Sequence, residues 1–202
     1  PNCGAGWAEL MNRWQPYVPI GFESYRSNAQ MTDDKGGPLW AVYNALDKHA
    51  DYLVFSSDTT ANPVDQQTLV FANQHLGRTI GDTPSVWVAL RETDPQYHFW
   101  YPQHGNYDFW LKQDDKVPGG KTVPEYNINR GKNSNDYKHG YGRYCRRTDG
   151  ATNNHFMYFK VNDGYIFALP TGVTFKVMYY DIGWDSWELQ YDGVDNVYHS
   201  LG

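Results

Sequence analysis

The sequence predicts a mainly β protein, in which an antiparallel, jelly-roll-like β-sandwich over residues 81–202 follows a smaller α/β segment over residues 1–80. Two observations predict this division. Before residue 80, short apolar runs alternate with segments whose apolar residues recur three and four positions apart, as on one face of a helix. After it the helical spacing disappears, and short alternating stretches are separated by Gly, Pro, Asn and Asp, which is typical of sandwiches.

The α/β segment consists of two βα units, each a strand followed by a helix. Residues 17–22 form the first apolar run, and Pro38 then occupies the first position of a helix whose apolar face continues to Leu46. Residues 52–55 form the second run. The next helix is expected to end at Gly77, because glycine readily adopts the left-handed conformation that closes helices.

Two such units leave the strands of a parallel sheet without neighbours on their outer edges. We therefore expect an upstream barrel portion or a partner chain to pack on residues 1–80. In (β/α) barrels and in open doubly wound sheets, chemistry is placed at the carboxyl ends of the strands. Glu23 follows the first apolar run and stands at such an end.

The sandwich segment is expected to contain strands at residues 86–90, 107–112, 173–180 and 187–191. In the last three, apolar and polar side chains alternate, so that one face of each strand is buried. Turns are expected at residues 118–120, 162–164, 181–183 and 192–193. The polar stretch 127–142 lacks periodicity, and we expect it to be a long surface loop.

The composition excludes some partners and leaves carbohydrate open. With 8 Trp, 17 Tyr and 9 Phe, aromatic residues make up 17% of the chain. Such rings fill sandwich cores and also offer flat faces to sugars, and composition does not separate these uses. The net charge of −6 comes from interleaved acidic and basic residues without a basic stripe, which argues against nucleic acid. No apolar run approaches the roughly 20 residues of a membrane span.

The two cysteines, Cys3 and Cys145, exclude a disulfide-dense scaffold and a Cys-based zinc cluster. One bridge between them and two isolated thiols are both compatible with the sequence, since a bridge requires Cα atoms about 6 Å apart. The first residues lack the charged-then-apolar order of a signal peptide. If the protein is exported, we expect the signal to have been removed or to lie upstream.

Four stretches carry a resemblance to known proteins: residues 83–92, 105–111, 118–124 and 178–181. They resemble the C-terminal sandwich modules of large secreted bacterial proteins, of the galactose-binding or jelly-roll kind, which follow a glycosidase-like barrel. The preceding segment is similar to the last βα units of such a (β/α)8 barrel. The resemblance implies a secreted, carbohydrate-directed protein related to glycoside hydrolases.

In retaining glycosidases of that kind the nucleophile is a Glu at the end of the seventh strand, and Glu23 is similar in placement. The alternative is a solvated loop glutamate paired with Arg26. Retaining hydrolysis needs a second carboxyl about 5 Å away. In the resembled barrels this acid/base lies on an earlier strand, so that residues 1–202 alone are expected to be catalytically incomplete.

Sugar binding is predicted at two aromatic groups. One combines stacking rings with Asp108, which can hydrogen-bond hydroxyls, and the other lies in the last hairpin. For both groups the alternative is core packing; Trp87 and Trp187 are expected in the core, and Trp100 and Trp184 at the surface. The predicted sugar-binding residues are Trp100, Tyr101, Tyr107, Asp108, Trp110 and Trp184.

Structural calcium is a further expectation, since sandwich modules of this kind hold the ion with loop carboxylates, and Asp163, Asp181 and Asp185 are turn carboxylates. Ordinary turn chemistry explains these residues equally well. Zinc is not expected, because the histidines are scattered.

Three functions therefore remain open: the C-terminal portion of a glycoside hydrolase, a non-catalytic carbohydrate-binding module, and a structural or adhesive surface protein. No serine-nucleophile elbow, phosphate-binding loop or zinc-protease motif occurs to favour another enzyme class.

Overall fold

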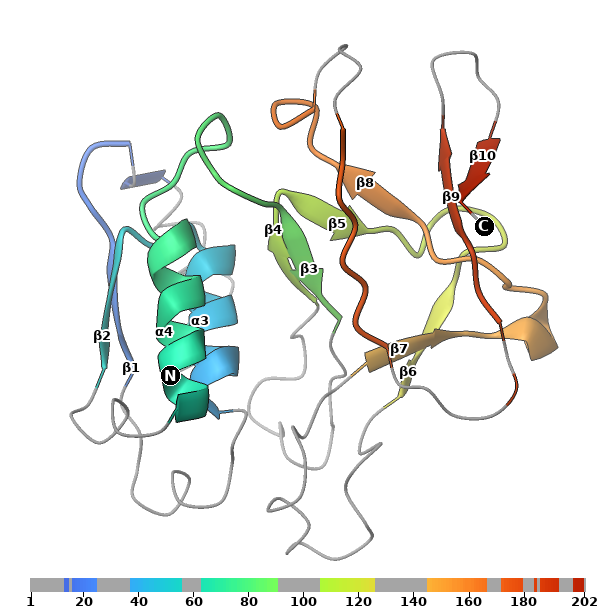
Figure 1. Ribbon diagram of the computed structural model, residues 1–202, viewed down its shortest axis with the longest axis horizontal. Helices are drawn as coiled ribbons and strands as arrows, with labels where there is room; N and C mark the ends of the chain where they lie inside the picture. Colours follow the sequence, from blue (N-terminus) through green and yellow to red (C-terminus); the bar gives the residue numbers. More distant parts are fainter. Residues whose placement is uncertain are drawn as a thin grey trace, which may run out of the picture. The chain divides into compact units, whose positions relative to one another are not determined.

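A computed structural model describes the chain over residues 13–14, 16–24, 37–55, 63–90, 106–125, 145–166, 172–179, 184, 186–192 and 198–201 (Figure 1). The chain divides into two compact units, Pro1–Thr171 and Gly172–Gly202. Strands predominate over the described residues, which confirms a mainly β protein. Over the same residues, no helix combines the length and apolar character that crossing a bilayer requires.

The first unit begins with the predicted strand–helix–strand–helix order. Strand β1 (Gly21–Ser24) runs parallel to β2 (Tyr52–Phe55), helix α3 (Gly37–Asp47) connects them, and α4 (Pro63–His75) follows. Figure 1 shows both helices on the same side of the strand pair. The two βα units are thus confirmed.

The sequence predicts the end of α4 correctly but places the start of the first strand too early. Gly77 has a φ of 65° and donates its N–H to the carbonyl of Ala50 at 3.0 Å, which confirms it as the stop after α4. The expected start of the first strand at residue 17 is wrong. There the N–H groups of Tyr17 and Val18 both bond the carbonyl of Trp14, so the backbone forms a turn and reaches the strand only at Gly21.

The core of the first unit lies between the helices and the first antiparallel strands. Val42 and Leu46 of α3 and Ala72 of α4 are buried against Phe109, which is fully buried. Trp87 packs half-buried on this cluster, as expected. Side chains from both sides of residue 80 therefore share one core, and the predicted domain boundary there stays a prediction.

The rest of the first unit consists of short antiparallel strand pairs. These are β3 (Trp87–Ala89) with β4 (Tyr107–Phe109), β5 (Leu111–Gln113) with β8 (Phe159–Val161), and β6 (Thr122–Glu125) with β7 (Cys145–Thr148), followed by the short helix η3 (Gly150–Thr152). The turns predicted at residues 118–120 and 162–164 are confirmed: Gly120 N–H bonds the Val117 carbonyl, and Gly164 N–H bonds Asn162 Oδ1.

The strand predicted at residues 107–112 is broken at Trp110. This residue has a φ of 54°, so the chain changes direction between β4 and β5. Its carbonyl accepts the N–H of Asn162 at 2.9 Å, and its ring stacks on His49 at 4.5 Å. A single left-handed residue thus lets the two halves of one alternating run pair with different strands.

The second unit contains the hairpin-like pair β9 (Leu189–Asp192) and β10 (Tyr198–Leu201), which are antiparallel. The strand predicted at 173–180 is not formed over its described residues, 173–179, whose side chains are all exposed and which have no described strand as a hydrogen-bonding neighbour. The closed sandwich stays a prediction. The polar stretch 127–142 and the turn at 181–183 lie outside the described residues.

Candidate functional sites

The β1–β2 pair has one face toward the helices and one open face. Phe22 and Leu53 are half-buried on the helix side, where Leu53 packs against the core. The opposite face carries Glu23, which is exposed and lies opposite Val54 in the register. Tyr52 and Val54 on this face are each 52% exposed. Strands of a parallel sheet are normally covered on both faces, so an apolar, open face is unusual.

Glu23 is the third of four residues in β1 and therefore lies near the carboxyl end of the parallel pair. This is the edge at which α/β folds place chemistry. The location agrees with the prediction for Glu23, whereas a catalytic role is untested. Arg26, its alternative ion-pair partner, lies outside the described residues.

The first predicted sugar-binding group is only partly described. Trp100 and Tyr101 lie outside the described residues. Tyr107 is 7% exposed, and Trp110 is half-buried with its ring stacked on His49. Tyr107 belongs to the core and has no open face of the kind that sugar stacking requires, and the His49 imidazole covers one face of the Trp110 ring.

Asp108, the acidic member of this group, is held in an unusual environment. Its backbone N–H donates to Asp47 Oδ1 at 2.7 Å, and the other carboxylate oxygen of Asp47 bonds the Lys48 ammonium. Burial, with a smaller contribution from the negative charge of Asp47, raises the pKa of Asp108 to about 6, against the opposing effect of Lys112 and Lys48. A carboxyl with such a pKa can transfer protons near neutral pH.

Asp108 and Glu23 are nevertheless at different ends of the fold. Asp47, which binds Asp108, ends α3, and β2 begins five residues later, so this cluster lies toward the amino ends of the parallel strands. Glu23 lies toward their carboxyl ends. The two carboxyls therefore do not form one catalytic pair, and the hydrogen bond from the Asp108 backbone N–H to Asp47 joins α3 to β4.

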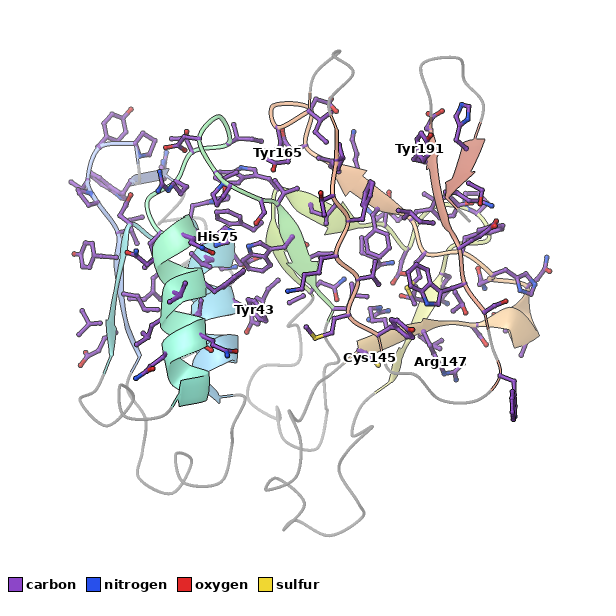
Figure 2. The ribbon with its side chains drawn as sticks, in the orientation of Figure 1. Tyr43, His75, Cys145, Arg147, Tyr165 and Tyr191 are labelled. Atoms are coloured by element: carbon purple, nitrogen blue, oxygen red, sulfur yellow. The ribbon has the colours of Figure 1, made fainter. Side chains whose placement is uncertain are left out.

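Sequence reasoning missed a buried histidine–serine pair. His75, at the end of α4, is 2% exposed (Figure 2). Its Nδ1 lies 2.8 Å from the Phe71 carbonyl and its Nε2 lies 2.8 Å from Ser85 Oγ. Because a carbonyl only accepts, Nδ1 carries the proton and Nε2 accepts from the serine hydroxyl. Burial lowers the pKa of His75, and the Phe71 carbonyl opposes this shift.

This contact has the atoms of a nucleophile–base pair, but His75 is enclosed by aromatic rings. Phe71, Trp87 and Phe109 lie 4.4, 6.3 and 5.4 Å from it, centroid to centroid. With so little of the imidazole exposed, a substrate has no route to it. The pair therefore joins α4 to the loop before β3. No sequence signal marks it, because the partners are ten residues apart across a turn.

In the second unit, Trp184 is fully exposed, as predicted. Trp187 is 56% exposed, so the prediction that it lies in the core is wrong. Its ring contacts that of Tyr179 edge-on, with the centroids 5.4 Å apart. Tyr191, labelled in Figure 2, stacks on His199 with centroids 5.3 Å apart. Trp187 stands two residues before β9, and Tyr191 belongs to that strand.

The metal and disulfide predictions are largely outside the described residues. Asp163 is exposed in its turn, whereas Asp181 and Asp185 are not described. Over the described part of the chain, no three His, Cys, Asp or Glu side chains gather as metal ligands would. Cys145 lies half-buried on β7 (Figure 2), and Cys3 is not described. Calcium and the Cys3–Cys145 pairing stay predictions.

Comparison of the chain with protein-family models, with curated proteins and with solved structures finds no match. The resemblance to barrel-and-sandwich proteins therefore stays a prediction. Any functional proposal rests on the residues and their geometry.

Proposed function

We propose that this chain is part of a secreted glycoside-hydrolase-like protein in which Glu23 is the nucleophile of a (β/α) barrel. The observation that carries the proposal is the position of Glu23 on the helix-free face of β1–β2, near the carboxyl ends of the strands. In a barrel this face is the interior, where catalytic side chains from strand ends converge.

The apolar residues beside Glu23 support the same arrangement. Tyr52 and Val54 are half-exposed on a face that parallel strands normally cover. Further parallel strands would bury both side chains and place Glu23 at one end of the enclosed interior. Alternation along β1 and β2, with helix-facing Phe22 and Leu53, is what a barrel requires of its strands.

In the proposed reaction the Glu23 carboxylate attacks the anomeric carbon and forms a glycosyl ester, which water then hydrolyses. A second carboxyl about 5 Å away protonates the leaving oxygen and later activates the water. Asp108 does not take this role, since it belongs to the opposite end of the strands. We assign the acid/base to a residue beyond those described.

The test uses the gene product that contains this chain and a panel of 2-fluoro glycosides, which trap the nucleophile of retaining glycosidases as a stable ester. We expect peptide mass spectrometry to find the label on Glu23, and Glu23→Gln to abolish labelling. The matched control is Glu188→Gln, which replaces an exposed glutamate of the second unit. In this variant Glu23 should still be labelled. Hydrolysis that survives in Glu23→Gln would contradict the proposal.

A second candidate function is carbohydrate binding without catalysis, through the exposed aromatic rings in and just before β9. It is favoured by the exposure of Trp187 and Tyr191 and by the fully exposed Trp184. Trp187→Ala or Trp184→Ala should each weaken binding to a polysaccharide panel by about 1 to 3 kcal/mol, by analogy with base stacking on aromatic rings. Phe156→Ala, which removes an exposed ring from the first unit, is the control.

If both tryptophan variants bind every polysaccharide as the unaltered chain does, stacking on these rings is excluded.

A further inference from the structure

Two lysines lie directly opposite each other on the β5–β8 pair. The antiparallel register places Lys112 against Lys160, and both side chains are exposed. Directly opposed residues have Cβ atoms about 5 Å apart, and like charges in this arrangement destabilise a sheet. The strand pair is three residues long on each side, so the lysines occupy its central position.

Nearby carboxylates form no ion pair with these lysines over the described residues. Lys112 interacts with the Asp108 carboxyl only at longer range, where it opposes the rise of that group's pKa. Asp114 follows on the same side of β5, and its Oδ1 accepts the backbone N–H of Lys116 at 2.8 Å. Neither lysine is therefore held in an ion pair with a described carboxylate, although the charge of Asp114 lies on the same side of the sheet.

An aromatic residue, Tyr158, stands two positions before Lys160 on β8's side of the register. The Asp114 N–H bonds the Tyr158 carbonyl at 2.9 Å, which extends the register by one pair and puts Tyr158 on the same side of the sheet as Lys160. Its half-buried ring lies against Gly120, over the space that a β-carbon there would occupy. Packing against Gly120 thereby fixes the orientation of the ring.

We infer that Lys112 and Lys160 form a binding site for the anionic groups, carboxylate or sulfate, of an acidic polysaccharide. The inference rests on the proposed carbohydrate-directed function and names its ligand class. Paired ammonium donors suit an oxyanion, and an adjacent fixed ring suits a sugar. Nucleic acid fits less well, because its binding depends on many phosphate contacts and the chain's net charge is −6.

The test compares binding of the full chain to polygalacturonate, dextran sulfate and unsubstituted dextran by calorimetry at low and high salt. We expect an anionic polymer to bind more tightly than dextran, and K112Q/K160Q to lose roughly tenfold or more in affinity for it. The control K116Q/K121Q removes two other exposed lysines and the same net charge, and should bind normally. Polygalacturonate and dextran sulfate separate carboxylate from sulfate recognition.

Equal losses in the two double variants, or no preference for either anionic polymer, would overturn the inference. So would equally tight, lysine-dependent binding of single-stranded DNA. Thermal unfolding without ligand gives a second measurement: Lys160→Gln should raise the melting temperature by up to about 3 °C, because it removes the repulsion. A lowered melting temperature would show that the lysine pair stabilises the fold and would remove the premise.

These outcomes are separable from the test of Glu23. Labelling of Glu23 together with lysine-independent binding would refute this inference and leave the hydrolase proposal intact. Lysine-dependent binding of an acidic polymer without labelling of Glu23 would refute the hydrolase proposal and leave this inference intact.

Discussion

Replacing Asp108 by Asn should stabilise the protein at neutral pH and should leave its stability at pH 3 almost unchanged. Burial and the charge of Asp47 raise the pKa of this carboxyl from 3.8 to about 6, so the folded protein prefers its protonated form. Asn has the same shape and carries no charge. The variant therefore removes the electrostatic cost that the ionised group imposes at pH 7.

The size and the pH window follow from the two pKa values. One pKa unit corresponds to about 1.4 kcal/mol, which gives about 3 kcal/mol for a fully shielded group with this shift. Asp108 is only half-buried, so solvent screening reduces the expected gain to about 1 to 1.5 kcal/mol. Between pH 3.8 and about 6 the folded state binds more protons than the unfolded state, so stability contributed by Asp108 falls as pH rises through this window.

Urea unfolding of both proteins at pH 3, 5 and 7 measures the effect. The difference between them isolates Asp108 from half-buried His49 and buried His75, whose pKa values are lowered by burial and whose pH dependence runs in the opposite direction. Asp163→Asn, an exposed turn carboxylate, is the control and should change stability by less than about 0.5 kcal/mol. The reasoning is refuted if Asp108→Asn destabilises the protein at pH 7, or if its advantage is the same at every pH.

Three further substitutions test other contacts by the same unfolding measurement. Ser85→Ala should lower the free energy of unfolding by about 1 to 3 kcal/mol, because it leaves Nε2 of buried His75 without its hydrogen-bond donor. If Ser85→Ala lowers it no more than the exposed control Ser186→Ala does, the contact is contradicted. Gly77→Ala should lower the free energy of unfolding by about 1 kcal/mol, because alanine is strained at the φ of 65° that Gly77 adopts. Gly81→Ala, with open space around the residue, should leave it nearly unchanged. Asp115→Asn should lower the free energy of unfolding by about 1 to 2 kcal/mol, since Asp115 accepts hydrogen bonds from the Thr122 N–H and hydroxyl and pairs with Arg146 at 2.9 Å. If the loss is no larger than that of Asp114→Asn, these contacts of Asp115 do not stabilise the fold.

The parts of the fold that could be predicted are those fixed by local chemistry. The run at residues 52–55 is β2, and Gly77 ends the second helical unit because only a residue without a side chain adopts its φ cheaply. Asn162 begins a turn because its side chain bonds the Gly164 N–H. In each case the residue types of a short segment mark the element, whichever distant segment it then pairs with.

The parts that could not be predicted depend on partners far along the chain. Nothing in the alternation of residues 107–112 marks Trp110 as left-handed, since a tryptophan has no preference for that conformation. Its stacking on His49, sixty-one residues earlier, accompanies the break. The raised pKa of Asp108 likewise depends on its burial and on Asp47, which stands sixty-one residues earlier in the sequence.

The candidate site shows the same division between local and distant information. A strand followed by a helix was enough to place Glu23 at the carboxyl end of β1, because parallel pairing fixes the direction of both strands. The pattern was not enough to choose between Tyr107 as a sugar platform and as a core residue, because both uses need an aromatic ring on an alternating strand. Only the position of β4 against α3 decides that choice, and it buries Tyr107. The proposed carbohydrate recognition therefore has to use rings other than Tyr107, and the exposed Trp184 and Trp187 are the first to test.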